Sequence, residues 1–183
     1  GVGSTLAIFG AGPVGLAAVM AAKIRECARI IVVEPMAQRR ALAIDLGATD
    51  VIDPATGDVA EAIRTIETDG IDFGLETSGR ETAITAGLAA LGSRGMLGLV
   101  GVPPRADDAL SINIAAMITF GHRVIGIIEG DSDQQGFIPE LLTLHRAGRF
   151  PFDRLITTFP LEAINDAIAA QHRGECVKAV LIP

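Results

Sequence analysis

Short apolar runs alternate along this chain with longer segments in which apolar residues recur at helical spacing. The runs predict six strands, at residues 6–9, 30–33, 50–53, 71–76, 95–100 and 123–127. Helices are predicted after residue 15 and at residues 35–46, 58–67, 81–91 and 111–118. Strands that alternate with helices in this way favour an α/β fold, a doubly wound parallel sheet (Rossmann fold) with helices on both faces.

The remainder of the chain follows a different pattern. It predicts a helix at residues 137–147, a short extended piece at 153–156, a helix at 161–171 and a last strand at 177–182. We therefore expect a dinucleotide-binding Rossmann domain at residues 1–150. Residues 151–183 would form a C-terminal tail of helix and strand that packs on this domain or on a catalytic domain outside the sequence.

The first strand runs directly into a glycine motif. Leu6-Ala7-Ile8-Phe9 is followed by Gly10-Ala11-Gly12-Pro13-Val14-Gly15, and the second strand ends at Glu34, nineteen residues beyond Gly15. This is the layout of a dinucleotide-binding βαβ unit, in which the glycines allow a tight turn, a close approach of the backbone to a pyrophosphate, and close helix packing. Tight turns without a nucleotide also use glycine, but the acid at the end of the second strand argues against that alternative.

Charge at the two ends of this unit indicates the cofactor. Pro13 suits the first turn of a helix, and the free N–H groups there form an anion site for the pyrophosphate. Glu34 would accept hydrogen bonds from the ribose hydroxyls. A carboxylate about 4 Å from a 2′-phosphate would cost on the order of 4 kcal/mol per unit charge, which favours NAD over NADP. Arg39 and Arg40 follow closely and would soften this preference.

Composition excludes several classes of protein. The chain has 183 residues, of which 49% are hydrophobic, and no uninterrupted apolar run long enough to span a membrane. A net charge of −7 with scattered Lys and Arg argues against nucleic-acid binding. Its two cysteines form no zinc motif and favour a reducing, cytoplasmic location. The absence of an initial Met suggests a fragment of a longer polypeptide.

Other polar residues have simpler interpretations than catalysis. The three histidines, His122, His145 and His172, are expected at the surface or near helix ends. The acidic series Glu129, Asp131 and Asp133 lacks the rest of a calcium loop, and a role in capping the next helix is favoured.

Several segments together resemble the medium-chain, zinc-dependent alcohol dehydrogenases. The resemblance covers nearly the whole chain, in order and at the right spacing. Its motifs are Gly3–Gly15, Gly47-Ala48-Thr49-Asp50, Gly70-Ile71-Asp72-Phe73 with Glu76, Gly98–Pro104, Phe159–Ala167 and Gly174-Glu175-Cys176-Val177-Lys178. The softer matches at residues 125–133 and 148–153 resemble the aryl-alcohol (benzyl-alcohol) branch of the family.

The resemblance implies a set of NAD contacts spread along the chain. These are Gly10, Gly12, Pro13, Val14 and Gly15 at the pyrophosphate, Glu34, Arg39, Ser78 and Arg80 at the adenosine, Val100 and Val102 at the nicotinamide carboxamide, and Lys178 near the pyrophosphate. Glu34 replaces the family's more usual Asp. The family holds its catalytic zinc in a separate, preceding domain, so no catalytic residue and no metal ligand is expected here.

The implied function is the NAD-binding half of an enzyme that transfers hydride between a primary alcohol, aromatic alcohols included, and NAD. This half alone is expected to be inactive. The alternatives are a non-catalytic NAD-binding sensor module and the cofactor domain of a zinc-free quinone-type reductase. The chain contains no Tyr, which excludes a short-chain dehydrogenase with a Tyr acid/base. We expect a homo-oligomer, with the strand at 123–127 as a candidate edge for pairing.

Overall fold

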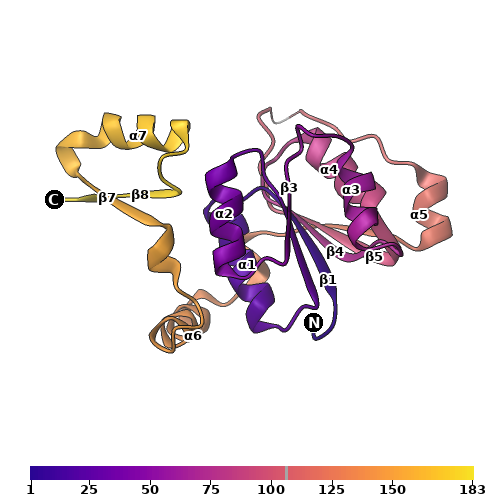
Figure 1. The fold of residues 1–183 in the computed structure, drawn as a ribbon, viewed down its shortest axis with the longest axis horizontal. Coiled ribbons are helices and arrows are strands. Elements are labelled where there is room, and N and C mark those ends of the chain that lie inside the picture. Colours follow the sequence, from indigo (N-terminus) through magenta and orange to yellow (C-terminus); the bar gives the residue numbers. More distant parts are fainter. Residues whose placement is uncertain (106) are drawn as a thin grey trace.

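The fold is built on one six-stranded parallel sheet, seen in Figure 1. The computed structural model describes residues 1–105 and 107–183. The strands are β1 (Thr5–Phe9), β2 (Arg29–Val33), β3 (Asp50–Ile52), β4 (Ile71–Glu76), β5 (Leu91–Leu99) and β6 (Arg123–Gly126). Their order is β3-β2-β1-β4-β5-β6, which is the order of a Rossmann fold. The doubly wound sheet expected from the sequence is confirmed.

Helices cover both faces of this sheet (Figure 1). On one face lie α1 (Pro13–Ile24) and α2 (Ala37–Leu46), and on the other α3 (Val59–Ile66) and α4 (Glu81–Ala90); α5 (Ile114–Phe120) precedes β6. Successive residues of a strand point to opposite faces. Accordingly, Ile8 of β1 belongs to the core under α1, whereas its neighbours Ala7 and Phe9 belong to the core under α3 and α4. Where both faces are covered, as along β1 and β2, the strands contain apolar residues at nearly every position.

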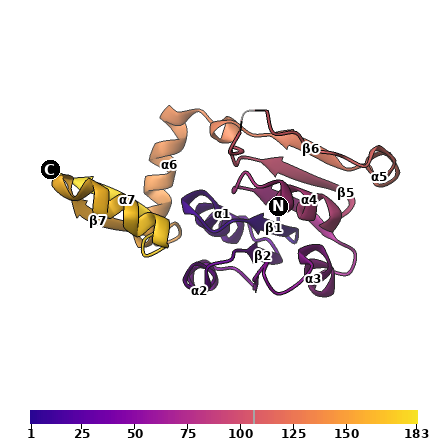
Figure 2. The same ribbon diagram turned by 90° about the horizontal axis from the view of Figure 1, so that it is seen from above.

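The tail begins on the α1 side of the sheet and then leaves it (Figure 2). It contains η1 (Glu129–Asp131), α6 (Gln134–Arg146), η2 (Phe152–Leu155), β7 (Ile156–Pro160), η3 (Leu161–Ala163), α7 (Ile164–Arg173) and β8 (Lys178–Ile182). Phe150 and Leu155 are buried in the same core as α1. β7 and β8 pair in parallel as a separate two-stranded sheet. The domain boundary at residue 150 stays a prediction.

The observed elements differ from expectation at three places in the chain. α5 begins after Asn113, whose Oδ1 accepts from Ala116 N at 3.0 Å, so the helix predicted from residue 111 starts later. The extended piece predicted at 153–156 is mostly the short 3₁₀ helix η2. Leu91, predicted to end a helix, instead begins β5. The expected cap at Asp133 is confirmed, because its Oδ1 accepts from Gln135 N. Among the described residues, no helix is both long enough and apolar enough to cross a bilayer.

One residue of β5 carries backbone strain. Arg94 has φ +62°, a left-handed conformation that costs a residue with a Cβ about 1–2 kcal/mol. We expect Arg94→Gly to raise the melting temperature by about 2 °C, in line with a gain of less than 1 kcal/mol for a domain of this size. The matched control is Arg123→Gly on β6, where the backbone lies outside the left-handed region and glycine should lower the melting temperature. Equal changes in melting temperature for Arg94→Gly and Arg123→Gly would show that Arg94 carries no backbone strain.

Candidate dinucleotide-binding site

The glycine loop after β1 is held at the carboxyl edge of the sheet by its neighbours. Gly10 N donates to Val33 O at 2.9 Å, which ties the loop to β2. On the other side, Thr77 Oγ1 lies 3.0 Å from Phe9 O and 3.2 Å from Gly10 O. Gly10 has φ +101°, a conformation in which a side chain would be strained. The turn out of β1 is therefore fixed from both flanking strands.

The other two glycines of the motif have different surroundings. A Cβ at Gly15 would lie 1.8 Å from Gly10 O, so only glycine lets α1 pack this close to the turn. A Cβ at Gly12 would meet no atom within 4 Å. The fold thus requires Gly15 but makes no demand at Gly12. The space beside Gly12 is open for the close approach of a ligand to the backbone.

The beginning of α1 offers hydrogen-bond donors to that space. Gly12 is the N-cap and has no side chain to accept from the first turn, and the first turn holds no acidic residue. Pro13 occupies the first helical position, and Val14 beside it is 52% exposed. The first N–H groups of a helix have no partner within it and carry the positive end of the helix dipole. This arrangement is suited to a phosphate anion.

Glu34 connects the glycine loop to α2. It follows β2 directly and is only 4% exposed. Its Oε2 accepts from Ala11 N at 2.7 Å, and its Oε1 accepts from Met36 N at 2.9 Å. A carboxylate has about four acceptor positions, so two remain beyond these backbone bonds. A diol placed against Glu34 would find acceptors there without displacing either backbone donor.

The two arginines after Glu34, Arg39 and Arg40, differ in their hydrogen bonds. Arg40 Nη1 donates to Glu34 O at 2.7 Å and to Pro35 O at 2.8 Å, and its Nη2 lies 3.0 Å from Asp53 Oδ2. Arg39 Nε, in contrast, is buried and has no hydrogen-bond partner among the described residues. Of these two arginines, Arg39 is therefore the one whose Nε is unpartnered among the described residues, whereas Arg40 is held by backbone oxygens and by Asp53.

A second buried carboxylate, Glu76, was not singled out as a site residue from the sequence. It ends β4, is fully buried, and accepts from the loop that follows. Ser78 N lies 2.6 Å and Ser78 Oγ 2.5 Å from its Oε1, and Gly79 N lies 3.0 Å from both carboxylate oxygens. The signal was present, since Glu76 ends an apolar strand just as β2 is followed by Glu34.

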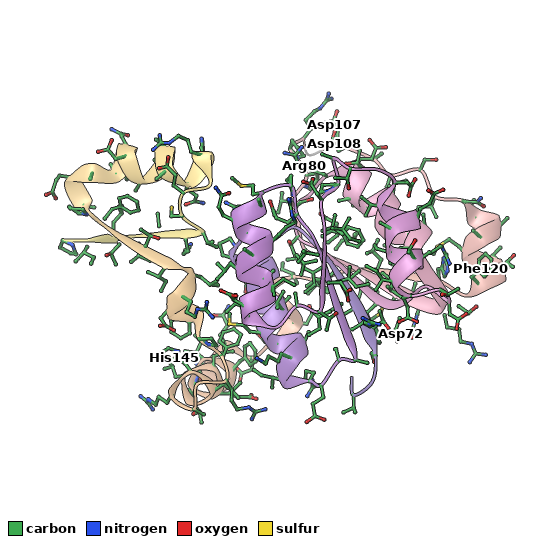
Figure 3. The ribbon with its side chains drawn as sticks, viewed as in Figure 1. Asp72, Arg80, Asp107, Asp108, Phe120 and His145 are labelled. Atoms are coloured by element: carbon green, nitrogen blue, oxygen red, sulfur yellow. The ribbon has the colours of Figure 1, made fainter. Side chains whose placement is uncertain are left out.

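The loops after β4 and β5 bring the remaining predicted residues to the same edge. Ser78 and Arg80 are exposed there, and Figure 3 shows Arg80 at the end of the sheet opposite Asp72. Ser78 Oγ donates to Glu76 and accepts from Arg80 N at 3.3 Å, so the hydroxyl has one lone pair left for a ligand. Val100 N donates to Glu76 O at 2.9 Å, and Val102 is 85% exposed.

Lys178 lies in a different part of the fold. It begins β8, in the two-stranded sheet, and is exposed. The turn before it approaches the site at one point, because a Cβ at Gly174 would overlap the end of the Met36 side chain. No hydrogen bond or ion pair between described residues joins Lys178 to the glycine loop. Its predicted contact with a pyrophosphate stays a prediction.

Other features of the described residues lie outside this edge. A cavity of about 620 Å³ lies between α4 and α5, lined by Leu88, Met117 and Phe120 among others, towards the amino ends of the strands. Residues 1–105 and 107–183 contain no group of three or more His, Cys, Asp or Glu side chains placed to hold a metal ion.

Comparison with known proteins identifies relatives along the whole chain. The chain is 42% identical over 183 residues to the geraniol dehydrogenase of Castellaniella defragrans, covering 100% of this chain and 49% of that protein. The crystal structure of benzyl alcohol dehydrogenase from Acinetobacter calcoaceticus is 34% identical, with a TM-score of 0.95 over 98% of this chain and 49% of that one. A zinc-binding dehydrogenase from Sinorhizobium meliloti 1021, whose structure holds NADP, is 28% identical, with a TM-score of 0.88 over 100% of this chain and 53% of that one.

The chain thus spans about half the length of these relatives. The zinc-binding dehydrogenase family model matches residues 13–144, which run from the start of α1 into α6. The matched residues include α1, Glu34, and the loops that follow β4 and β5. The resemblance read from the sequence is confirmed: the chain belongs to the zinc-binding dehydrogenase family.

Proposed function

We propose that this chain is the NAD-binding part of an alcohol dehydrogenase. The observation that carries the proposal is the buried Glu34 carboxylate, which bonds the glycine loop and the start of α2 and keeps acceptors for a ribose diol. The open space at Gly12 and the uncapped start of α1 supply a pyrophosphate site beside it. The family match and the alcohol dehydrogenases among the relatives support the same function.

Each part of the site has a distinct task in this proposal. The N–H groups at the start of α1 bind the pyrophosphate, and Glu34 accepts from the adenosine ribose. Arg39, Ser78 and Arg80 border the adenosine. Backbone groups around Val100 and Val102 bind the carboxamide, which orients the nicotinamide for hydride transfer. Lys178 is assigned to the pyrophosphate by the family resemblance alone, because it begins β8 in the separate sheet. NAD held by these groups would supply the hydride acceptor for alcohol oxidation, and zinc held outside this chain would supply the charge that polarises the alcohol oxygen.

Primary alcohols, aromatic ones included, are the substrate class we propose for the whole protein. Two relatives support it through their names, geraniol dehydrogenase and benzyl alcohol dehydrogenase. Substrate contacts and zinc ligands would come from the half of such proteins that this chain does not cover. A cofactor domain of a quinone-type reductase or a sensor module is less well supported, because the relatives are alcohol dehydrogenases and Glu34 disfavours NADPH.

The direct test is calorimetric titration of this chain with NAD and, separately, with NADP. The expected result is tighter binding of NAD, because the Glu34 carboxylate repels a 2′-phosphate and Arg40 is committed to Asp53. Calorimetry is preferable to fluorescence transfer because the chain contains no Trp. Tighter binding of NADP would contradict the choice of cofactor, and binding of neither would contradict the dinucleotide site.

We also propose that a second copy of the chain pairs along β6. This strand lies at one edge of the sheet, and Ile125 on it is 39% exposed. Nearby α5 exposes Ile114 at 72% and Ile118 at 77%. An unpaired edge beside exposed apolar side chains is a natural interface for a two-fold dimer. Light scattering is expected to give the mass of a dimer.

A charge placed on this edge should separate the copies. Ile125→Lys is expected to shift the chain to monomer, because the buried ammonium would lie in the interface. Ile44→Lys is the matched control: Ile44 is 44% exposed on α2, away from β6, and this variant should remain dimeric. A monomer at every concentration of the unchanged chain would overturn the proposed pairing.

A further inference from the structure

We infer that Glu76 is a positioning residue that sets the distance between the two halves of the cofactor site. This inference rests on the proposed binding of NAD. Glu76 ends β4 and is fully buried, and the hydrogen bonds of its carboxylate go to Ser78 and Gly79. The carboxylate lies between the loop after β4, which carries Ser78 and Arg80, and the loop after β5, which carries Val100 and Val102.

The hydrogen bonds of Glu76 join these two loops through one residue. The side chain accepts from Ser78 N, Ser78 Oγ and Gly79 N, which bends the first loop around the carboxylate. The main-chain oxygen of the same residue accepts from Val100 N at 2.9 Å and from Gly101 N at 3.0 Å. Glu76 therefore holds the loop after β4 through its side chain and the loop after β5 through its main chain.

The two loops also touch each other with no space for a side chain. A Cβ at Gly79 would lie 2.1 Å from Val102 O, and a Cβ at Gly101 would lie 2.1 Å from Gly79 N and 2.7 Å from Glu76 Oε2. Gly79 and Gly101 therefore pack directly against each other, and Glu76 Oε2 lies beside their contact. A small displacement of Glu76 would change the separation of the loops.

This separation matters only to a ligand that spans both loops. In the proposed site the loop after β4 borders the adenosine, whereas the loop after β5 binds the nicotinamide carboxamide. NAD touches both loops at once. ADP-ribose retains the adenosine and pyrophosphate but lacks nicotinamide, so its binding does not depend on where the second loop lies. The loss caused by changing Glu76 should therefore be larger for NAD than for ADP-ribose.

The test is Glu76→Gln in this chain, titrated with NAD and with ADP-ribose by calorimetry. Gln has the same shape and keeps the acceptor facing Ser78, but its amide places a donor against Gly79 N. Losing a hydrogen bond to a charged acceptor corresponds to about tenfold or more in affinity. We expect the affinity for NAD to fall about tenfold and that for ADP-ribose to fall less than about threefold.

A second variant reaches the same contact without altering the carboxylate. The methyl group of Gly101→Ala forces the loops apart. This variant should therefore also lose more affinity for NAD than for ADP-ribose. The matched control is Asp72→Asn on the same strand, where Asp72 Oδ2 accepts from Thr5 N at 2.9 Å at the opposite edge of the sheet (Figure 3). This control should change neither affinity.

The outcomes separate the inference from the function on which it rests. If the unchanged chain binds NAD and Glu76→Gln weakens both ligands equally, or neither, then Glu76 does not set the separation and the inference is wrong. If Glu76→Gln does not fold, the affinity losses of Gly101→Ala for NAD and for ADP-ribose are compared instead. Failure of the unchanged chain to bind NAD or ADP-ribose would overturn the proposed function itself, and this inference with it.

Discussion

Gly12→Ala is expected to weaken the binding of NAD about 100-fold, a loss of about 2.7 kcal/mol, while the protein remains folded. A Cβ at this position meets no protein atom within 4 Å, so the folded chain accommodates it. The methyl group would instead occupy the space in which the pyrophosphate approaches the backbone at the start of α1. Calorimetry with NAD and a thermal melt of the same sample measure the two effects.

Gly15→Ala is the matched change at the next glycine, and unlike Gly12→Ala it should strongly lower the stability of the fold. Its Cβ would lie 1.8 Å from Gly10 O, so α1 has to move away from the sheet. Overpacking of this kind costs about 3 kcal/mol, and the melting temperature should fall by about 6–12 °C. If Gly12→Ala destabilised the fold as much as Gly15→Ala, or left NAD binding unchanged, the open space at Gly12 would not be a ligand site.

Glu34→Ala is expected to weaken the binding of NAD about 30-fold. Hydrogen bonds to a charged group are worth about 1.5–3 kcal/mol, and this variant removes the acceptors proposed for the ribose hydroxyls. It also releases Ala11 N and Met36 N, which loosens the glycine loop and the start of α2. Calorimetric titration with NAD measures the loss.

The same variant should change the choice of cofactor. Without the carboxylate, the repulsion of a 2′-phosphate disappears and Arg39, whose Nε has no partner among the described residues, can bind it. The ratio of NAD to NADP affinity should therefore fall at least about tenfold. Asp50→Ala is the control, because Asp50 begins the neighbouring β3 and pairs with Arg29 outside the site. An unchanged ratio in Glu34→Ala would mean that Glu34 does not face the ribose.

The six strands of the main sheet follow from information that is local in the chain. Apolar runs of strand length and helical spacing between them predict six strands and their helices, and the observed sheet has these strands in Rossmann order. Gly10, Gly12, Gly15 and Glu34 were predictable for the same reason, since the motif places turn, helix and acid within one βαβ unit. Their order along the chain is local, whereas the bonds that Thr77 makes to the turn come from a distant segment.

Contacts between distant segments were decided only by the tertiary structure. The sequence contains two arginines after Glu34, but only the fold brings Asp53 to Arg40 and leaves Arg39 Nε without a partner among the described residues. Such choices depend on which groups meet after folding, and no local pattern records them.

The sequence by itself therefore determined the class of fold, the glycine motif and the acid that follows the second strand. The tertiary structure decided that the last strand pairs with β7 in a separate sheet, and that Glu76 ties the loop after β4 to the loop after β5. The physical reason is the same in both cases. Periodicity and turn chemistry act over a few residues, whereas a buried carboxylate or a strand edge finds its partner only when distant segments pack together.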